Sequence, residues 1–199
     1  MEEMKITNVL FAGVGGQGIL TSGRLVALAA LHAGLDVKMS EVHGMAQRGG
    51  NVDVHVRLGP VVPSSLIPRG GAHYLVSFEK LEALRYLDYL RADGVVYVNR
   101  LEIPPLATSL KKGASYVADI DKVLEEKAPT LVWVDGTELA RQLGDPRMVN
   151  VILIGALSTR FKELKAEDWE AAIKERFPKP KVTESVLAGF RRGVEYVAA

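Results

Sequence analysis

Cysteine is absent from this chain of 199 residues. Its absence excludes disulfides, a thiolate nucleophile, and cysteine ligands for zinc or for an iron–sulfur cluster. If the protein works in a system that passes electrons through iron–sulfur centres, those centres belong to another polypeptide.

Long apolar runs and an excess of charge are missing as well. The longest apolar runs, residues 25–31 and 151–157, are far shorter than the ~20 residues that span a bilayer. The N-terminus reads MEEMK and lacks the basic lead-in of a signal peptide. Lys and Arg number 25 against 24 Asp and Glu, so the net charge of +1 gives no electrostatic drive toward nucleic acid. These absences predict a cytoplasmic protein that binds neither membranes nor nucleic acids.

The remaining composition is that of a globular protein. Hydrophobic residues make up 48% and charged residues 25%, proportions at which a chain of this length can bury a sizeable core. We expect a single domain over residues 1–199. Amides are scarce, with three Gln and four Asn, a feature found in proteins of thermophiles.

The order of sequence patterns predicts an α/β fold. Residues 6–12 predict a buried strand, residues 19–33 a helix, and residues 36–42 a second strand. The intervening GVGGQG loop (residues 13–18) makes this a Rossmann-like βαβ start, which implies a parallel sheet. Further strands are predicted at 52–58, 74–78, 95–99, 115–118 and 131–135, and helices at 79–91, 121–127, 137–143, 145–161, 167–176 and 184–197. We therefore predict a three-layer α/β/α sandwich with a mainly parallel sheet.

The GVGGQG loop is the first candidate site. Gly13, Gly15 and Gly18 match the pattern G-x-G-x-x-G, in which the glycines and the start of the following helix favour a phosphate or another anion. A Rossmann nucleotide site also needs an acid after the second strand. Glu41 lies 23 residues beyond Gly18, near the expected spacing of about 20. A tight turn without a ligand stays open as the alternative.

A second glycine-rich loop, HGMAQRGG at residues 43–50, follows the second predicted strand. Since both loops follow parallel strands, we expect them at one edge of the sheet, where open α/β sheets bind ligands. Arg48 offers a rigid, permanently charged fork for a carboxylate or a phosphate. We predict that this loop binds a ligand or a partner protein. Arg48→Ala should leave the chain folded and impair that binding.

Other functional classes find little support. The histidine spacings match no zinc motif, and no nucleophile-plus-base pattern is present. We therefore predict no metal site and no catalytic residue on this chain. His32 is expected to be a core histidine. Asp53, His55 and Arg57 are expected on a polar strand face turned to solvent or to an interface, and Asp135 is open to helix capping or a site role.

Three segments resemble a known family. GVGGQG, SEVHGMAQRGG (residues 40–50) and VDGTELARQLGDPRMVNVILIGALS (residues 134–158) are similar to the gamma domain of 2-oxoacid:ferredoxin oxidoreductases. The resemblance extends from residue 6 to about residue 196. Within that family, the form His-Gly-Met-Ala-Gln-Arg-Gly-Gly resembles the beta subunits of the indolepyruvate branch.

The resemblance implies a reaction and a division of labour. The reaction is oxidative decarboxylation of an aryl 2-oxoacid such as indolepyruvate, with coenzyme A as acyl acceptor and ferredoxin as electron acceptor. A large partner subunit is expected to hold thiamine diphosphate, magnesium and the iron–sulfur clusters, and this chain to be inactive alone. The candidate cofactor-binding residues are those of the two loops together with one acid: Gly13, Gly15, Gly16, Gln17, Gly18, Glu41, His43, Gln47, Arg48, Gly49 and Gly50. Coenzyme A, thiamine diphosphate and the partner surface are all open as what these residues contact.

Two other functions stay open. A stand-alone NAD(P)-binding dehydrogenase would rest on G-x-G-x-x-G and Glu41, although no Tyr-x-x-x-Lys set and no substrate domain accompany them. A non-catalytic structural or ligand-binding subunit would need neither. Whether the isolated chain forms a homodimer is equally open.

Overall fold

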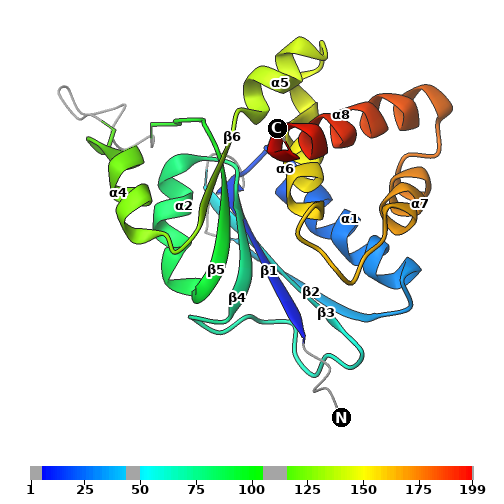
Figure 1. Ribbon diagram of the computed structural model, residues 1–199, viewed down its shortest axis with the longest axis horizontal. Coiled ribbons are helices and arrows are strands. Elements are labelled where there is room, and N and C mark those ends of the chain that lie inside the picture. The colour runs from blue at the N-terminus through cyan, green and yellow to red at the C-terminus, as the bar shows by residue number, and fades with distance from the viewer. Residues whose placement is uncertain (1–5, 44–49, 105–115, 199) are drawn as a thin grey trace.

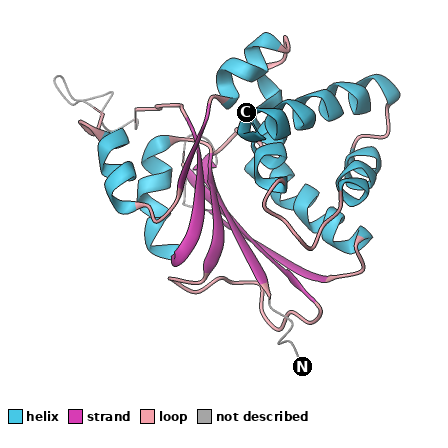
Figure 2. Cartoon of the chain, in the orientation of Figure 1, coloured by secondary structure: helices cyan, strands magenta, loops and turns pink. Residues whose placement is uncertain are grey.

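The computed structural model describes residues 6–43, 50–104 and 116–198. A six-stranded sheet carries helices on both of its faces (Figure 1, Figure 2), which confirms the predicted α/β class. The strands are β1 (Thr7–Val14), β2 (Asp36–His43), β3 (Asn51–Gly59), β4 (Ala72–Ser77), β5 (Leu90–Asn99) and β6 (Leu131–Val134). The helices are α1 (Ile19–His32), α2 (Lys80–Tyr86), α4 (Ile120–Lys127), α5 (Gly136–Gln142), α6 (Val149–Ser158), α7 (Ala166–Arg176) and α8 (Pro180–Ala198).

The sheet is mainly parallel, as predicted, but β3 interrupts it. The strand order is β2-β3-β1-β4-β5-β6, and β3 runs antiparallel to both of its neighbours. β1 and β2 therefore share a direction without touching, which the simple βαβ interpretation did not foresee. The cause is the short connection between β2 and β3, because a connection of that length joins antiparallel strands and leaves no room for a crossover.

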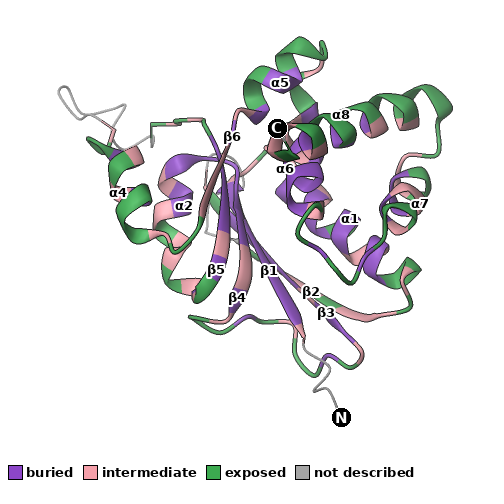
Figure 3. Cartoon of the chain, in the orientation of Figure 1, coloured by how far each residue is buried: buried purple, intermediate pink, exposed green. Residues whose placement is uncertain are grey.

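The two faces of the sheet are covered differently. α1, α6, α7 and α8 lie over what we call the inner face, whereas α2 and α4 cover the β1-β4-β5-β6 part of the outer face (Figure 1). α1 lies directly on β3, because Gly23 faces that strand: a Cβ at Gly23 would sit 2.6 Å from Val54 Cγ1. Burial is deepest along the strands and on the helix sides that face them (Figure 3).

α6 and α8 cross unusually closely above the inner face. A Cβ at Gly155 would lie 2.0 Å from the Phe190 carbonyl oxygen, and one at Gly193 would lie 1.9 Å from the Ile152 carbonyl oxygen. Distances this short leave no space for a methyl group, so the two backbones approach through their glycines.

Several element boundaries differ from the sequence prediction. The helix predicted over 79–91 ends at Tyr86, because Leu90 already pairs with Ala72 in the sheet. The helix predicted from residue 145 starts as a 3₁₀ turn, and α6 proper begins at Val149. The strand predicted at 115–118 is wrong over residues 116–118, which form turns and irregular backbone; residue 115 lies outside the described residues.

Candidate functional site

The first glycine loop lies at the carboxyl end of β1, where the chain turns into α1. Gly16 and Gly18 have φ angles of 103° and 84°, a region that residues with a side chain rarely adopt. Gly18 is the N-cap of α1, so the positive end of the helix dipole and the first backbone N–H groups point out of the loop. This geometry suits an anion.

Gln17 fastens the loop to the sheet. Its Oε1 accepts a hydrogen bond from the Val14 N–H at 2.7 Å, and its Nε2 donates to the Phe78 carbonyl oxygen at 3.3 Å. A Cβ at Gly13 would lie 2.7 Å from the same Oε1, which explains the glycine there. Gln17 thus has a structural role that the sequence did not reveal, and ligand contact by its side chain stays a prediction.

Two hollows open on either side of this loop. One, of about 350 Å³, is lined by Gly16 and Gly18 together with Thr137, Arg147 and Asn150 from the start of α5 and the approach to α6. We call it the α6 cleft. Residues so distant in sequence could not be assigned to the site from spacing alone, although VDGTELARQLGDPRMVN carries them. Volumes of this order hold small ligands or parts of larger ones.

The other hollow, also about 350 Å³, lies between the glycine loop and Glu41. β3 separates β2 from β1, yet Glu41 faces the inner side of the sheet, like its register partner Val54 in β3. The acid predicted to bind ribose is therefore beside the loop, as a nucleotide site would need. The insertion of β3 between β1 and β2 departs from the Rossmann arrangement, in which these two strands are neighbours.

The second glycine loop meets the first through its last residue. The Gly15 N–H donates to the Gly50 carbonyl oxygen at 3.0 Å, which places Gly50 at the sheet edge predicted for both loops. His43 ends β2, opposite Val52 of β3. Gln47, Arg48 and Gly49 lie outside the described residues, so their predicted roles stay predictions.

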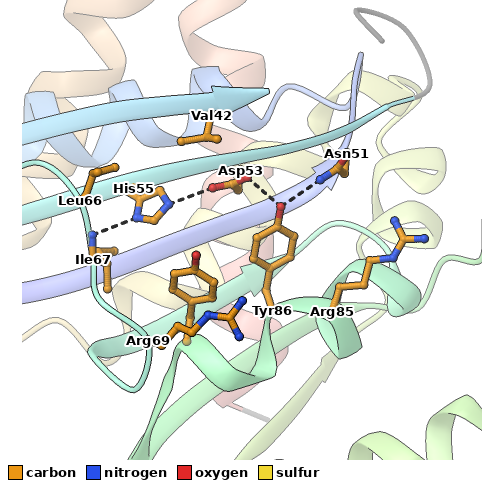
Figure 4. Close-up of a pocket in the computed structure, with 10 residues that line it drawn as sticks. Val42, Asn51, Asp53, His55, Leu66, Ile67, Arg69, Arg85 and Tyr86 are labelled. Carbon is orange, nitrogen blue, oxygen red and sulfur yellow. Dashed lines mark hydrogen bonds and ion pairs between the residues drawn. The ribbon is translucent and has the colours of Figure 1, made fainter. Parts of the chain in front are cut away.

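The polar side chains of β3 were expected to face solvent or an interface, and for Asp53 and His55 this is wrong. They are only 6% and 3% exposed, because the segment 60–71 and the end of α2 cover them. Both line a hollow of about 490 Å³ on the outer face, whose side chains Figure 4 shows. The Ile67 N–H donates to His55 Nδ1 at 3.0 Å, so Nε2 carries the proton and donates to Asp53 Oδ2 at 2.9 Å.

Tyr86 and Asn51 extend this network. The Tyr86 hydroxyl donates to Asp53 Oδ1 at 2.7 Å, and Asn51 Nδ2 donates to the Tyr86 hydroxyl at 3.2 Å. Burial raises the pKa of the Tyr86 phenol, and its hydrogen bond to Asp53 raises the pKa further. The hydroxyl therefore stays protonated at neutral pH and acts as a donor to the carboxylate.

The remaining candidates, His32 and Asp135, each contact a side chain distant in sequence. His32, expected in the core, is on the surface at the end of α1, where its ring contacts Glu175 Oε2 at 2.9 Å. Asp135 occupies the N-cap position of α5 without a side-chain cap bond, and accepts from the Tyr196 hydroxyl at 2.8 Å. Within the described ranges, no three His, Asp or Glu side chains group as a metal site. No helix in those ranges has both the length and the apolar character needed to cross a membrane.

The comparisons with known proteins agree on one family. Residues 8–196 match the family described as pyruvate ferredoxin/flavodoxin oxidoreductase. The chain is 40% identical over 195 residues to indolepyruvate oxidoreductase subunit IorB of Thermococcus kodakarensis, with 96% of each chain covered.

Two solved structures share the fold. Pyruvate oxidoreductase subunit PORC of Thermotoga maritima has a TM-score of 0.73 at 23% identity, with 96% of each chain covered. A 2-oxoglutarate:ferredoxin oxidoreductase of Magnetococcus marinus, solved with 2-oxoglutarate, coenzyme A and succinyl-CoA bound, has a TM-score of 0.75 at 20% identity. That match covers 98% of this chain but 32% of the other.

Proposed function

The chain belongs to the pyruvate ferredoxin/flavodoxin oxidoreductase family, and from this premise we propose that it is the small subunit of an oxidoreductase acting on indolepyruvate or a similar aryl 2-oxoacid. One observation carries the choice of substrate. The 40% identity to the indolepyruvate oxidoreductase subunit extends over 96% of both chains, whereas the matches to the pyruvate and 2-oxoglutarate enzymes support the fold alone.

The reaction needs groups that this chain does not supply. Thiamine diphosphate would stabilise the carbanion left by decarboxylation, and iron–sulfur clusters would pass the electrons to ferredoxin. A chain without cysteine offers no thiolates for such clusters. In the Magnetococcus marinus protein a fold like this one is a third of a longer chain, since the match covers 32% of it. We propose that a separate large subunit supplies the rest, in the cytoplasm, where coenzyme A and ferredoxin are found.

The geometry of the glycine edge supports coenzyme A as the ligand. The backbone of Gly16 and Gly18 at the start of α1 suits a phosphate group, and the α6 cleft beside it is lined by the aliphatic side chains of Leu101 and Val149 with Arg147 at its rim. An anionic, partly apolar ligand matches both features. In this proposal the chain binds and orients the acyl acceptor, and it holds no group that transfers a proton or an electron.

Reconstitution tests the subunit assignment. The chain, the copurifying large subunit and their mixture are assayed anaerobically with indolepyruvate, coenzyme A and an artificial electron acceptor. We expect turnover only from the mixture. Turnover by this chain alone, or undiminished turnover by the large subunit alone, would refute the assignment.

Ligand preference separates coenzyme A from a dinucleotide. A ligand at 100 times its dissociation constant stabilises a protein by about 2.7 kcal/mol, which a thermal-shift assay detects. Stabilisation by coenzyme A supports the proposal, and stabilisation by NAD or NADP would favour a dehydrogenase.

Two arginine variants test the ligand site. Arg147→Ala should raise the KM for coenzyme A in the complex, and we expect the same of Arg48→Ala if its loop serves the site. Arg141→Ala is the control, because Arg141, like Arg147, pairs with an acid close in sequence but does not line the α6 cleft. Equal effects of Arg147→Ala and Arg141→Ala would remove the α6 cleft from the proposal.

A further inference from the structure

The hydrogen-bond network on the outer face ends where the two glycine loops meet. Asn51 directly follows Gly50, whose carbonyl oxygen accepts the Gly15 N–H at 3.0 Å. The register partner of Asn51 in β1 is Val14, the residue before Gly15. The side chain of Asn51 donates to Tyr86 at 3.2 Å, so the network is attached to the backbone at this junction (Figure 4).

The segment that carries Tyr86 also contacts the first loop. Phe78 lies just before α2, and its carbonyl oxygen accepts from Gln17 at 3.3 Å and from Asn99 at 3.1 Å. Tyr86 ends the same helix. Residues 78–86 thus hold the first loop at one end and the base of the second loop at the other.

The network buries a carboxylate, which costs desolvation free energy. Asp53 is 6% exposed and, among the described residues, its carboxylate is paired with no Lys or Arg. Its contacts are the two neutral donors His55 and Tyr86. Burying a charge on neutral donors gains little stability over apolar packing, but it fixes the positions of the groups involved. The inner side of the same strand is filled by valines instead.

We propose that Tyr86 is a positioning residue for the oxidoreductase reaction: its hydroxyl, held by Asp53, fixes Asn51 and thereby the Gly15–Gly50 contact that sets one glycine loop against the other. The inference rests on the proposed function, in which this edge faces coenzyme A and the large subunit. Tyr86 itself lines the outer hollow, and its hydroxyl bonds to Asp53 and Asn51 rather than to Gly15 or Gly50. It acts through Asn51.

Tyr86→Phe tests the positioning in the isolated chain, with Tyr89→Phe as the matched control. Tyr89 lines the same hollow with its ring centroid 5.8 Å from that of Tyr86, and its hydroxyl forms no hydrogen bond within the described part of the chain. Removing one hydroxyl that holds the junction should speed hydrogen exchange of the Gly15 amide by about tenfold. Tyr89→Phe should leave that rate unchanged. An unchanged rate in Tyr86→Phe would overturn the proposal.

The assembled complex tests the consequence for the reaction. Tyr86→Phe should lower kcat/KM for coenzyme A roughly tenfold in a complex that still assembles fully, because a displaced edge misplaces the ligand. Asn51→Ala should do the same, and the double variant should add little, since both act on one contact. A loss of activity that only follows a loss of assembly would mean a merely structural role. An inactive wild-type complex would refute the proposed function, whereas an active one with unaffected Tyr86→Phe kinetics would refute only this inference.

Discussion

Over residues 52–56 the two faces of β3 are equally buried, but different interactions stabilise them. On the inner face, Val52, Val54 and Val56 pack under α1 by shape alone. On the outer face, Asp53 and His55 are as buried as those valines, yet each of their polar atoms is matched to a named partner. The alternating sequence of β3 therefore places apolar packing on one side of the strand and a hydrogen-bond network on the other.

The difference predicts how each face responds to change. Apolar packing is non-directional, so a substitution on the inner side removes stability in proportion to the volume lost or forced in. Hydrogen bonds are directional, so a change on the outer side leaves specific groups unsatisfied and moves what they held. The inner side should dominate stability, and the outer side should dominate the geometry of the glycine edge.

Gly155→Ala should have the largest effect on the inner side. The new Cβ would sit 2.0 Å from the Phe190 carbonyl oxygen, a backbone atom that cannot move without separating α6 from α8. We expect a loss of about 3 kcal/mol or more in the free energy of unfolding, measured with urea. Gly34→Ala is the control: its φ is +75°, with nothing within 4 Å of the added Cβ among the described residues. It should lose only about 1 kcal/mol, and equal losses would show that the crossing is not tight.

Asp53→Leu should come next, on the outer side. It leaves the His55 Nε2–H and the Tyr86 hydroxyl without their acceptor, at a cost of about 2–3 kcal/mol. Because His55 belongs to the same network, the double variant with His55→Leu should lose less than the sum of the two single losses. Strict additivity in urea unfolding would mean that the network is not a unit.

Sequence patterns found what is local. The strand and helix periods placed most elements, and the glycine motifs placed the first loop and Gly50 of the second at one sheet edge. The patterns failed to predict burial where the deciding contact is not local. His55 is buried because the segment around Ile67, 12 residues further along the chain, folds back over it, and the Ile67 N–H donates to its ring. His32 is exposed because the apolar stripe of α1 ends before it, and its partner Glu175 is 143 residues away.

The same limit applies to the candidate site. G-x-G-x-x-G identified the turn that we propose as the anion site, because its glycines lie close together in the chain. The α6 cleft is completed by Thr137, Arg147 and Asn150, more than a hundred residues downstream, and no spacing rule links them to the loop. The insertion of β3 was missed for a related reason, since alternation predicts a strand but not its neighbours.

The titration of Glu82, on the outer side, should have a smaller effect on the stability of the chain. Burial raises the pKa of this carboxyl above its usual 4.5, and the nearby Arg85 guanidinium partly offsets the rise. The folded chain therefore holds this proton more tightly than the unfolded chain. Its contribution to stability is complete below the unfolded pKa and is lost as the pH rises through the folded pKa. The urea midpoint of wild type should fall more between pH 4 and pH 7 than that of Glu82→Gln, and parallel profiles would contradict the assignment.

Glu138→Gln should have the smallest effect, although the pKa of Glu138 is lowered to about 2 by hydrogen bonds from Arg141 and Gln142. A lowered pKa contributes stability above the unfolded pKa and loses it as the pH falls through the folded one. At pH 7 that contribution would be present in full, so a large contribution of Glu138 to the free energy of unfolding should be measurable there. We nevertheless expect unfolding curves that superimpose on wild type, because the pair is exposed on α5 and solvent screens exposed ion pairs. A clear loss at pH 7 that 1 M salt does not remove would show that burial is not what separates this carboxylate from Asp53 on β3.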